Sequence, residues 1–316
     1  MTNTIAEAIC PESSKVDQNQ ESDLSGGGQA LSWEHVRPFL RAYWPLLVAL
    51  LAVYASVLLD LVRDWWQNPD YSHGLLLPFA ALFLLYRKRS ILSSLRPQPV
   101  SWTGAGLMIA SQGIFLVGVL GAEFFLQRFS LLLLLAGMIL YLRGWAFLKE
   151  TSFLFLLGLL SIPLPAVIFN SVALPLQLTA SSLAEQFLRL LNVPVYREGN
   201  ILQVSTQMLD VAEACSGIRS LMSLLTLGSL LAYFLPVRWW LRALFVAATV
   251  PIALGANAIR IGITGLLALH FGEKAAQGFF HTFEGWIVFV VAFGCLFSLY
   301  TIIAKFASNV ERPAHS

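Results

Sequence analysis

The chain has 316 residues, of which 57% are hydrophobic and only 12% are charged, and its formal net charge is +2. Soluble globular domains carry about a quarter charged residues, so this composition excludes an ordinary soluble protein and indicates an integral membrane protein. No basic stripe or glycine-rich phosphate loop supports binding of nucleic acids or nucleotides.

The two ends of the chain differ in composition from the part between them. Residues 1–32 are polar, rich in Ser, Gln, Glu and Gly, and have no periodic apolar face, which predicts a disordered cytoplasmic tail. They lack the basic segment and apolar stretch of a secretory signal peptide. Residues 33–305 are predicted to form one polytopic membrane domain, and residues 306–316 a short cytoplasmic C-terminal tail.

A helix that crosses a bilayer needs about 20 apolar residues. The candidate segments, some of them short, are 43–62, 74–87, 103–121, 129–142, 151–166, 216–235, 241–268 and 283–304. The segment 166–192 is apolar in parts but contains Glu185 and Arg189, so it is predicted as an amphipathic helix near an interface, with a further crossing as the alternative. The predicted fold class is therefore an all-α integral membrane protein with about eight transmembrane helices.

The connection before the sixth predicted span has a different pattern. Apolar and polar residues alternate around a Gly-Asn turn at 199–200, which predicts a small β-hairpin. The loop Asp64-Trp65-Trp66, which follows the first predicted span, is typical of an interfacial anchor.

The distribution of lysine and arginine predicts the orientation in the membrane. With eight crossings and both termini in the cytoplasm, the inner loops hold most of the basic residues, namely Arg37, Arg41, Arg87, Lys88, Arg89, Arg96, Arg143, Lys149, Arg238, Arg242, Lys305 and Arg312. The outer loops hold Arg63, Arg128, Arg189, Arg197 and Lys274. This orientation brings Cys215, Arg260, His281 and His73 to the extracytoplasmic side.

Cys215 is the candidate nucleophile. It stands where a predicted helix begins, and Arg219 follows one helical turn later. Both the helix N-terminus and the guanidinium favour thiolate over thiol. The alternative is an ordinary buried cysteine, which is the interpretation that we favour for Cys295, since that residue lies in a run of Val, Phe and Leu. Cys10, Cys215 and Cys295 have no CxxC spacing, so neither a disulfide framework nor a zinc site is indicated.

Arg260 lies in an otherwise apolar predicted helix. A guanidinium at membrane depth costs about 2.5–3.5 kcal/mol on insertion scales, so such residues usually face the protein interior and have a function. Arg260 could stabilise the oxyanion of a tetrahedral intermediate. The alternative is that it snorkels to the outer head groups. Asn257, one turn earlier on the same face, could orient it.

His281 is the candidate general base and acid, because imidazole commonly serves a cysteine nucleophile in that role. His270 is a rival base, and His73 has either a supporting or a structural role. A metal site formed by these three histidines with Asp70 is a further alternative, but their spacing has no ligand signature. No metal and no organic cofactor is predicted.

Four strings in this order resemble those of the exosortase/archaeosortase family of membrane cysteine transpeptidases, over roughly residues 60–305. They are Tyr-Ser-His-Gly at 71–74, Ile-Pro-Leu-Pro at 162–165, Glu-Ala-Cys-Ser-Gly-Ile-Arg-Ser at 213–220, and Asn-Ala-Ile-Arg-Ile at 257–261 followed by Gly-Phe-Phe-His at 278–281. The resemblance implies that Cys215 is the nucleophile, Arg260 the electrophilic partner and His281 the third catalytic residue, with Arg219 in support.

The resemblance also implies a substrate and a compartment. Such enzymes cleave membrane-anchored proteins at a C-terminal sorting signal of the PEP-CTERM type, which combines a short motif, a transmembrane helix and a basic cluster. They act outside the membrane through a thioester and pass the new C-terminus to an acceptor, for which exopolysaccharide and lipid are candidates. A histidine at the third position is typical of the bacterial branch, which implies a bacterial inner membrane. The alternatives are a purely hydrolytic membrane cysteine protease and a non-enzymatic polysaccharide-export scaffold or transporter.

Overall fold

The computed structural model describes residues 33–204, 207–210, 217–271 and 279–310, which are almost entirely helical. The chain divides into two units, residues 1–55 and 56–316. The described part of the first unit belongs to helix α1 (Trp33–Gln67), and the second unit contains the remaining elements. The predicted tails, 1–32 and 306–316, lie wholly or mostly outside the described residues and stay predictions.

Each of the eight predicted spans coincides with a helix, and the all-α membrane class is confirmed. The helices are α1, α2 (Leu77–Ser94), α3 (Ser101–Leu120), α4 (Phe124–Leu142), α5 (Trp145–Ser161), α8 (Gly217–Phe234), α9 (Trp239–Phe271) and α11 (Phe279–Val310). Five described helices have the length and composition to cross a membrane, namely α3, α4, α6 (Ala166–Leu190) and the Trp239–His270 and Gly285–Ala307 parts of α9 and α11. The number of crossings stays a prediction.

Two predicted boundaries differ from the structure for physical reasons. α5 ends at Ser161, because Pro163 and Pro165 lack the backbone N–H that a helix needs. The segment before α2 is a separate 3-10 helix, η1 (Pro69–Leu76), in which Asn68 caps the first turn by accepting a hydrogen bond from the Asp70 N–H.

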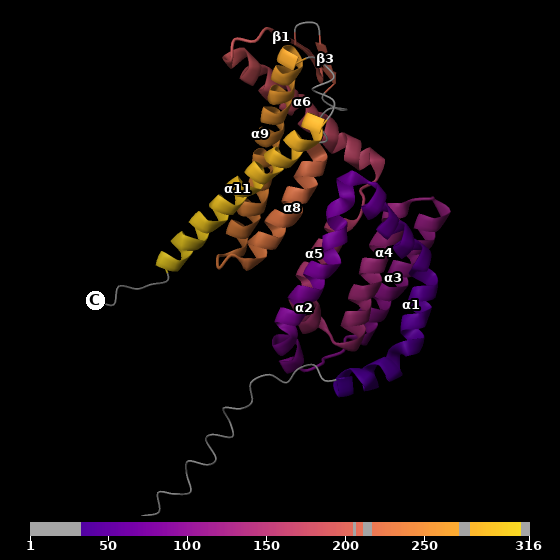
Figure 1. Cartoon of the computed structure of the whole chain (residues 1–316). Coiled ribbons are helices and arrows are strands. Elements are labelled where there is room, and N and C mark those ends of the chain that lie inside the picture. Colours follow the sequence, from indigo (N-terminus) through magenta and orange to yellow (C-terminus); the bar gives the residue numbers. More distant parts are fainter. Residues whose placement is uncertain (1–32, 205–206, 211–216, 272–278, 311–316) are drawn as a thin grey trace, which may run out of the picture. The chain divides into compact units, whose positions relative to one another are not determined.

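Helices α8, α9 and α11 pack side by side (Figure 1), around a core of small and large apolar residues. The buried members of this core are Leu224, Ala232, Leu235, Phe245, Ala253, Ala292 and Leu296. A second cluster joins α2 and α5 to α8 through Leu77, Leu84 and Leu157. In α3 and α4, Gly104 and Gly137 allow a close helix pair, because a Cβ on Gly104 would lie 2.5 Å from the Tyr141 backbone nitrogen.

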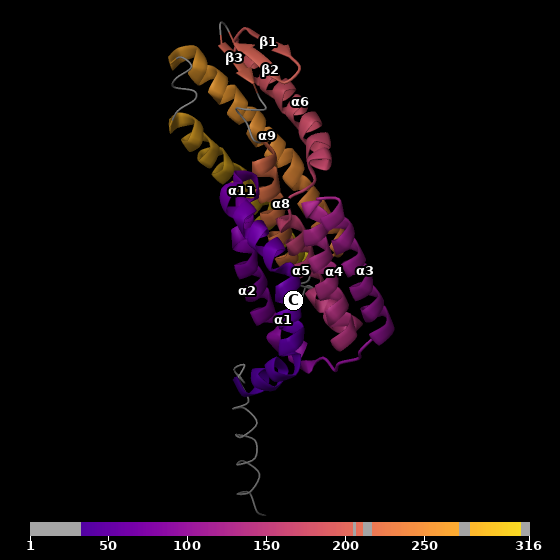
Figure 2. The same ribbon diagram turned by 90° about the vertical axis from the view of Figure 1, so that its right-hand side faces the viewer.

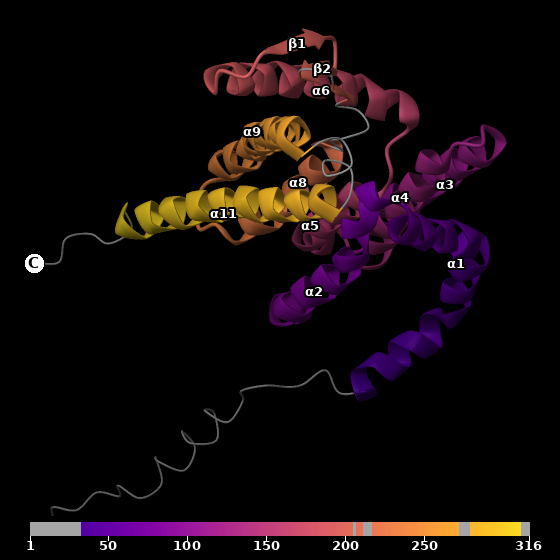
Figure 3. The same cartoon turned by 45° about the horizontal axis from the view of Figure 1, so that its top comes forward.

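The predicted hairpin is present and continues into a third strand. Strands β1 (Val195–Glu198), β2 (Ile201–Val204) and β3 (Gln207–Asp210) form an antiparallel sheet in that order, beside the C-terminal end of α6 (Figure 2). The sheet packs inward through Leu202, which meets Ala180 and Ala184 of α6 and Ile261 of α9. Figure 3 shows α6 lying alongside α9 with the sheet next to it.

The outer surface of the helices carries many large apolar side chains. Examples are Ile109, Leu116, Val117, Leu120, Trp239, Leu244, Val290, Val291 and Phe306. Such a surface suits contact with lipid tails. The prediction that Cys295 is buried is wrong, because the buried stripe of α11 runs through Ala292 and Leu296 and leaves Cys295 exposed beside it.

Candidate active site

A cavity of about 630 Å³ lies between η1, α2, α8, α9 and α11. Its lining residues come from segments that are far apart in the chain, and they are Pro69, Ser72, His73, Leu76, Leu77, Ala80, Arg219, Ser220, Ser223, Thr226, Leu227, Leu230, Arg260, Gly285, Trp286 and Phe289. The structure therefore brings together three of the residues that the sequence singles out, His73, Arg219 and Arg260.

The cavity is polar at one end and apolar at the other. On α8, the first lining residues are Arg219, Ser220 and Ser223, and the later ones are Leu227 and Leu230. At 1.5 Å per residue this change occurs over about 16 Å of helix. The cavity therefore fits a ligand that has a polar segment joined to an apolar one.

Arg260 projects from α9 and is 9% exposed, so it does not snorkel to a free surface. Its guanidinium packs against the backbone of α11, because a Cβ placed on Gly285 would lie 3.4 Å from both Cζ and Nη2. The Thr264 hydroxyl donates a hydrogen bond to the Arg260 carbonyl at 3.0 Å. This guanidinium is buried and packed against a neighbouring helix in a partly apolar cavity. There it can stabilise a developing negative charge more strongly than a guanidinium exposed to water could.

Arg219 forms an ion pair across the cavity wall. Its Nε donates a hydrogen bond to Asp70 Oδ1 at 3.0 Å, which joins α8 to η1. The sequence did not identify this pair, because the two residues are 149 positions apart and no local pattern connects them. In the sequence alone, Asp70 stands out only as a possible metal ligand.

The wall of the cavity that η1 provides is fixed to the C-terminal end of α5. The Trp65 indole N–H donates a hydrogen bond to the Ser161 carbonyl at 2.8 Å, and the Leu164 N–H donates to the Tyr71 hydroxyl at 3.1 Å. Gly74 leaves room for the Trp65 ring, which a Cβ at that position would approach to 2.4 Å. These contacts give a structural explanation for the strings at 71–74 and 162–165.

Trp65 and Trp66 therefore have different surroundings. Trp65 is 8% exposed and belongs to the packed interior, whereas Trp66 is 78% exposed. The prediction of an interfacial anchor is wrong for Trp65, which is buried, and stays a prediction for the exposed Trp66. The error arises because a short tryptophan-rich sequence does not reveal which ring has a hydrogen-bond partner.

His73 lies on the cavity wall and also contacts α5. Its Nε2 is 3.3 Å from the Leu160 carbonyl oxygen, and its Nδ1 is buried. Burial lowers the pKa of the imidazole below its ordinary value of 6.5, and the backbone carbonyls of Leu160 and Asp70 offset part of this effect. At neutral pH His73 is therefore an uncharged group, which donates to Leu160 through the Nε2 tautomer.

The rival base His270 lies elsewhere. It is exposed in the last turn of α9, where its Nδ1 is 2.9 Å from the Leu266 carbonyl oxygen. The ten residues that separate it from Arg260 correspond to about 15 Å of helix, and it does not line the cavity. No group of three or more His, Cys, Asp and Glu that could hold a metal occurs among the residues that the structure describes.

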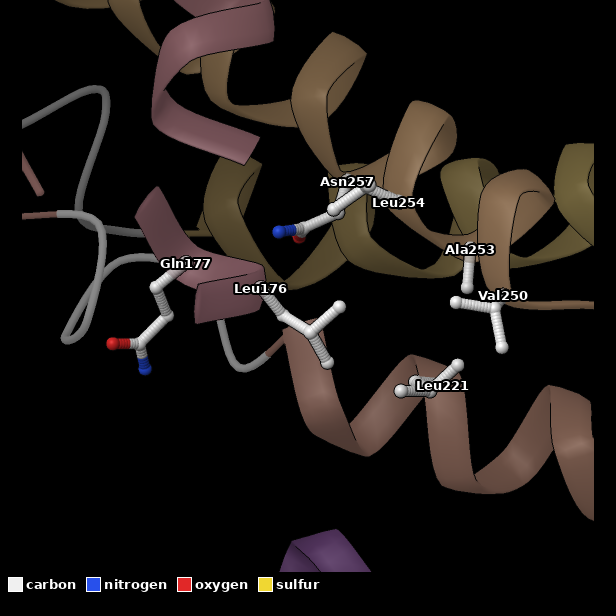
Figure 4. Close-up of a pocket in the computed structure, with 7 residues that line it drawn as sticks. All are labelled: Leu176, Gln177, Leu221, Val250, Ala253, Leu254 and Asn257. Atoms are coloured by element: carbon white, nitrogen blue, oxygen red, sulfur yellow. The ribbon is translucent and has the colours of Figure 1, made fainter. Parts of the chain in front are cut away.

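Asn257 is buried on α9 but lines a neighbouring pocket rather than the cavity of Arg260. Figure 4 shows its amide directed from α9 toward α6, where Gln177 lies. Its Oδ1 accepts no hydrogen bond within the described part of the chain. The role of Asn257 in orienting Arg260 stays a prediction.

Cys215 lies outside the described residues, and position 281 lies in the first turn of α11 without a described side chain. The sequence connects these positions to helices that line the cavity. Cys215 precedes the first residue of α8 by two positions, and position 281 precedes Gly285 in α11 by four. The described parts of α8 and α11 contribute Arg219 and Gly285 to the lining, and the roles of Cys215 and His281 stay predictions.

The family model of transmembrane exosortases matches residues 65–298, which is more than half of the chain. The chain belongs to the transmembrane exosortase family. This membership supports a role as a membrane transpeptidase or protease, with membrane proteins as substrates in a bilayer. No curated protein and no solved structure matches the chain. The matched region includes η1, the cavity and every predicted site residue.

The contact between Arg260 and Gly285 leads to a first prediction. The substitution Gly285→Val is expected to push the guanidinium away from its place and to lower processing activity by roughly ten-fold or more, since small displacements of catalytic groups are costly. Gly294→Val is the matched control, because Gly294 lies on the same helix with nothing within 4 Å of an added Cβ. Equal activity of the two variants would contradict the prediction.

His73 leads to a second prediction, on the pH dependence of stability. Because its pKa is lowered in the folded protein, the unfolded chain binds the proton more readily. The stability associated with neutral His73 is complete above the ordinary pKa of about 6.5 and is lost as the pH falls through the lowered pKa. Thermal unfolding in detergent at pH 7.5 and 5.5 is expected to show a smaller acid-induced fall in Tm for His73→Gln than for wild type. Parallel falls would refute this assignment.

Proposed function

We propose that this member of the family is a cysteine transpeptidase that cleaves membrane-anchored proteins at a C-terminal sorting signal of the PEP-CTERM type. The observation that carries the proposal is the cavity that Arg260 lines together with the first turn of α8 and with Gly285 and Phe289 of α11. Its polar end suits a short peptide motif, and its apolar end suits the start of the transmembrane helix that follows such a motif.

In the proposed first step, the Cys215 thiolate attacks the carbonyl carbon of the scissile peptide bond and forms a C–S bond. Arg260 stabilises the negative charge on the carbonyl oxygen of the tetrahedral intermediate. As the intermediate collapses, the C–N bond breaks and His281 donates a proton to the leaving amine. The products are a thioester at Cys215 and a released C-terminal segment.

In the second step, an amine or hydroxyl group of an acceptor attacks the thioester carbon while His281 removes its proton. The C–S bond breaks and the Cys215 thiolate is regenerated. If water takes the place of the acceptor, the same residues perform simple hydrolysis. The acceptor, for which exopolysaccharide and lipid are the candidate classes, therefore decides between transpeptidase and protease. No metal or organic cofactor enters either step.

The arrangement of charges supports an extracytoplasmic site in a bacterial inner membrane, with both termini in the cytoplasm. The first turn of α8 lines the cavity, and two of the predicted inner residues lie near the opposite end of α8. There Lys88 pairs with Glu150 at 3.0 Å, and the guanidinium of Arg87 lies 5.6 Å from the centre of the Phe234 ring. Since basic residues favour the cytoplasmic side, the cavity would face the other side.

The decisive test is a processing assay in membranes. A tagged reporter that carries a short motif, an apolar helix and a basic cluster at its C-terminus is expressed with wild type or with Cys215→Ser. Wild type should process the reporter, and the serine variant should accumulate in the membrane to the same level without processing it. The C-terminal mass of the product separates transfer from hydrolysis. Equal processing by both variants would refute Cys215 as nucleophile and favour the scaffold alternative.

A further inference from the structure

The ion pair between Asp70 and Arg219 leads to an inference that rests on the proposed function. We propose that Asp70 is a positioning residue of the reaction, which holds the Arg219 guanidinium at the polar end of the cavity. Arg219 lines the cavity and follows Cys215 by four residues, so its position affects the place where the thiolate would act. Asp70 itself does not line the cavity, so it would act through Arg219.

Asp70 is well suited to this role because its own backbone is held firmly. Its N–H donates to Asn68 Oδ1 at 3.0 Å, and the neighbouring Tyr71 is anchored to Leu164. Pro69 restricts the backbone directly before it. The carboxylate is therefore presented from the wall that η1 and α5 form together, while Arg219 comes from the separate helix α8. The ion pair links these two walls at the polar end of the cavity.

The exposure of the pair argues against a role in overall stability. The Arg219 side chain is 46% exposed and that of Asp70 is 27% exposed. Ion pairs with this much access to solvent contribute little to folding stability. They can still select one orientation of a long side chain that has many rotamers, and the selected orientation here directs a cation into the polar end of the cavity.

Charge balance points in the same direction. Among the residues that the structure describes, the cavity lining includes two arginines, Arg219 and Arg260, and no carboxylate. Asp70 is bonded to the rim arginine, whereas Arg260 lies deeper, at 9% exposure, against Gly285. Arg219 is thus paired with a carboxylate of the wall, and the Arg260 guanidinium lies next to Gly285 of α11. Without the Asp70 carboxylate, the Arg219 side chain could turn away from the polar end of the cavity.

The test is a double-mutant cycle in the full-length protein, with initial rates of reporter processing measured over a range of reporter levels. Asp70→Asn and Arg219→Gln are each expected to lower the maximal rate roughly 10- to 100-fold with little change in apparent KM. The double variant should be no slower than Arg219→Gln, because the two residues act as one unit. Asp70→Glu should restore most of the rate.

Asp60→Asn is the matched control, because Asp60 forms an exposed ion pair with Arg63 at 3.3 Å, away from the cavity. It should leave the rate unchanged, and the Tm of all variants should stay close to that of wild type. The inference would be overturned if the rate losses of the two single variants multiply in the double variant, or if Asp70→Asn has the wild-type rate. In either case an inactive Cys215→Ser variant would still support the proposed function. Active Cys215→Ser in the same assay would overturn both.

Discussion

Replacement of Arg260 by glutamine is expected to lower the rate constant of reporter cleavage by about 10²–10³, the range found when a single oxyanion-stabilising donor is removed. The guanidinium is buried beside Gly285 and lines the cavity, so nothing from solvent can replace its charge readily. Arg260→Lys should retain part of the activity, because it keeps the charge but loses the planar set of donors. The measurement is the initial rate of processing in membranes at matched protein levels.

Arg242→Gln is the control for this experiment. Arg242 lies near the other end of α9, where its Nε donates to the Leu235 carbonyl at 3.1 Å, and it does not line the cavity. Its loss should leave the rate within about two-fold of wild type, in line with the small effects of most substitutions away from a site. If Arg260→Gln is no slower than Arg242→Gln, Arg260 does not stabilise the transition state.

The substitution Gly74→Ala is expected to destabilise the protein by about 1–3 kcal/mol, the usual cost of an added methyl group in a filled interior. The added Cβ would lie 2.4 Å from Trp65 Cδ1 and Nε1. Trp65 cannot turn away without losing its hydrogen bond to the Ser161 carbonyl. The Tm in detergent should therefore fall by several degrees, and processing should fall with it because η1 forms a wall of the cavity.

Gly113→Ala in α3 serves as the comparison, since nothing lies within 4 Å of a Cβ at that position. Alanine favours a helix over glycine by up to about 1 kcal/mol, so the Tm of this variant should be unchanged or slightly higher. A Gly74→Ala protein that is as stable as Gly113→Ala would show that η1 and Trp65 are not packed as described.

The sequence predicts the helices well and their partners poorly. The apolar runs identify α3, α4 and α9 because length and hydrophobicity alone define a membrane helix. Arg260 stands out in the sequence because a charged residue within an apolar run is costly in a membrane and usually has a function. The antiparallel sheet was foreseen in part from the Gly-Asn turn between β1 and β2, whereas β3 lacked a comparable signal.

What the sequence could not predict are contacts between distant segments. The pairing of Asp70 with Arg219, and the hydrogen bond from Trp65 to Ser161, join residues that no helical or strand period relates. Glycines are a further case, because the importance of Gly74 and Gly285 depends on the side chain that lies against each of them. The position of His270 illustrates the same point, since only the path of α9 shows that this histidine does not line the cavity.

The change from polar to apolar lining along α8 affects the fate of a covalent intermediate. A thioester formed at the polar end would have Leu227, Leu230 and Phe289 on the far side of the same cavity, where few water molecules find hydrogen-bond partners. Competition between water and an acceptor depends on how many of each reach the reactive carbon. In the proposed mechanism, an apolar wall on one side of the cavity would lengthen the lifetime of the thioester and give a scarce acceptor time to arrive. The partition between transfer and hydrolysis would then be set by the apolar wall as much as by the catalytic groups.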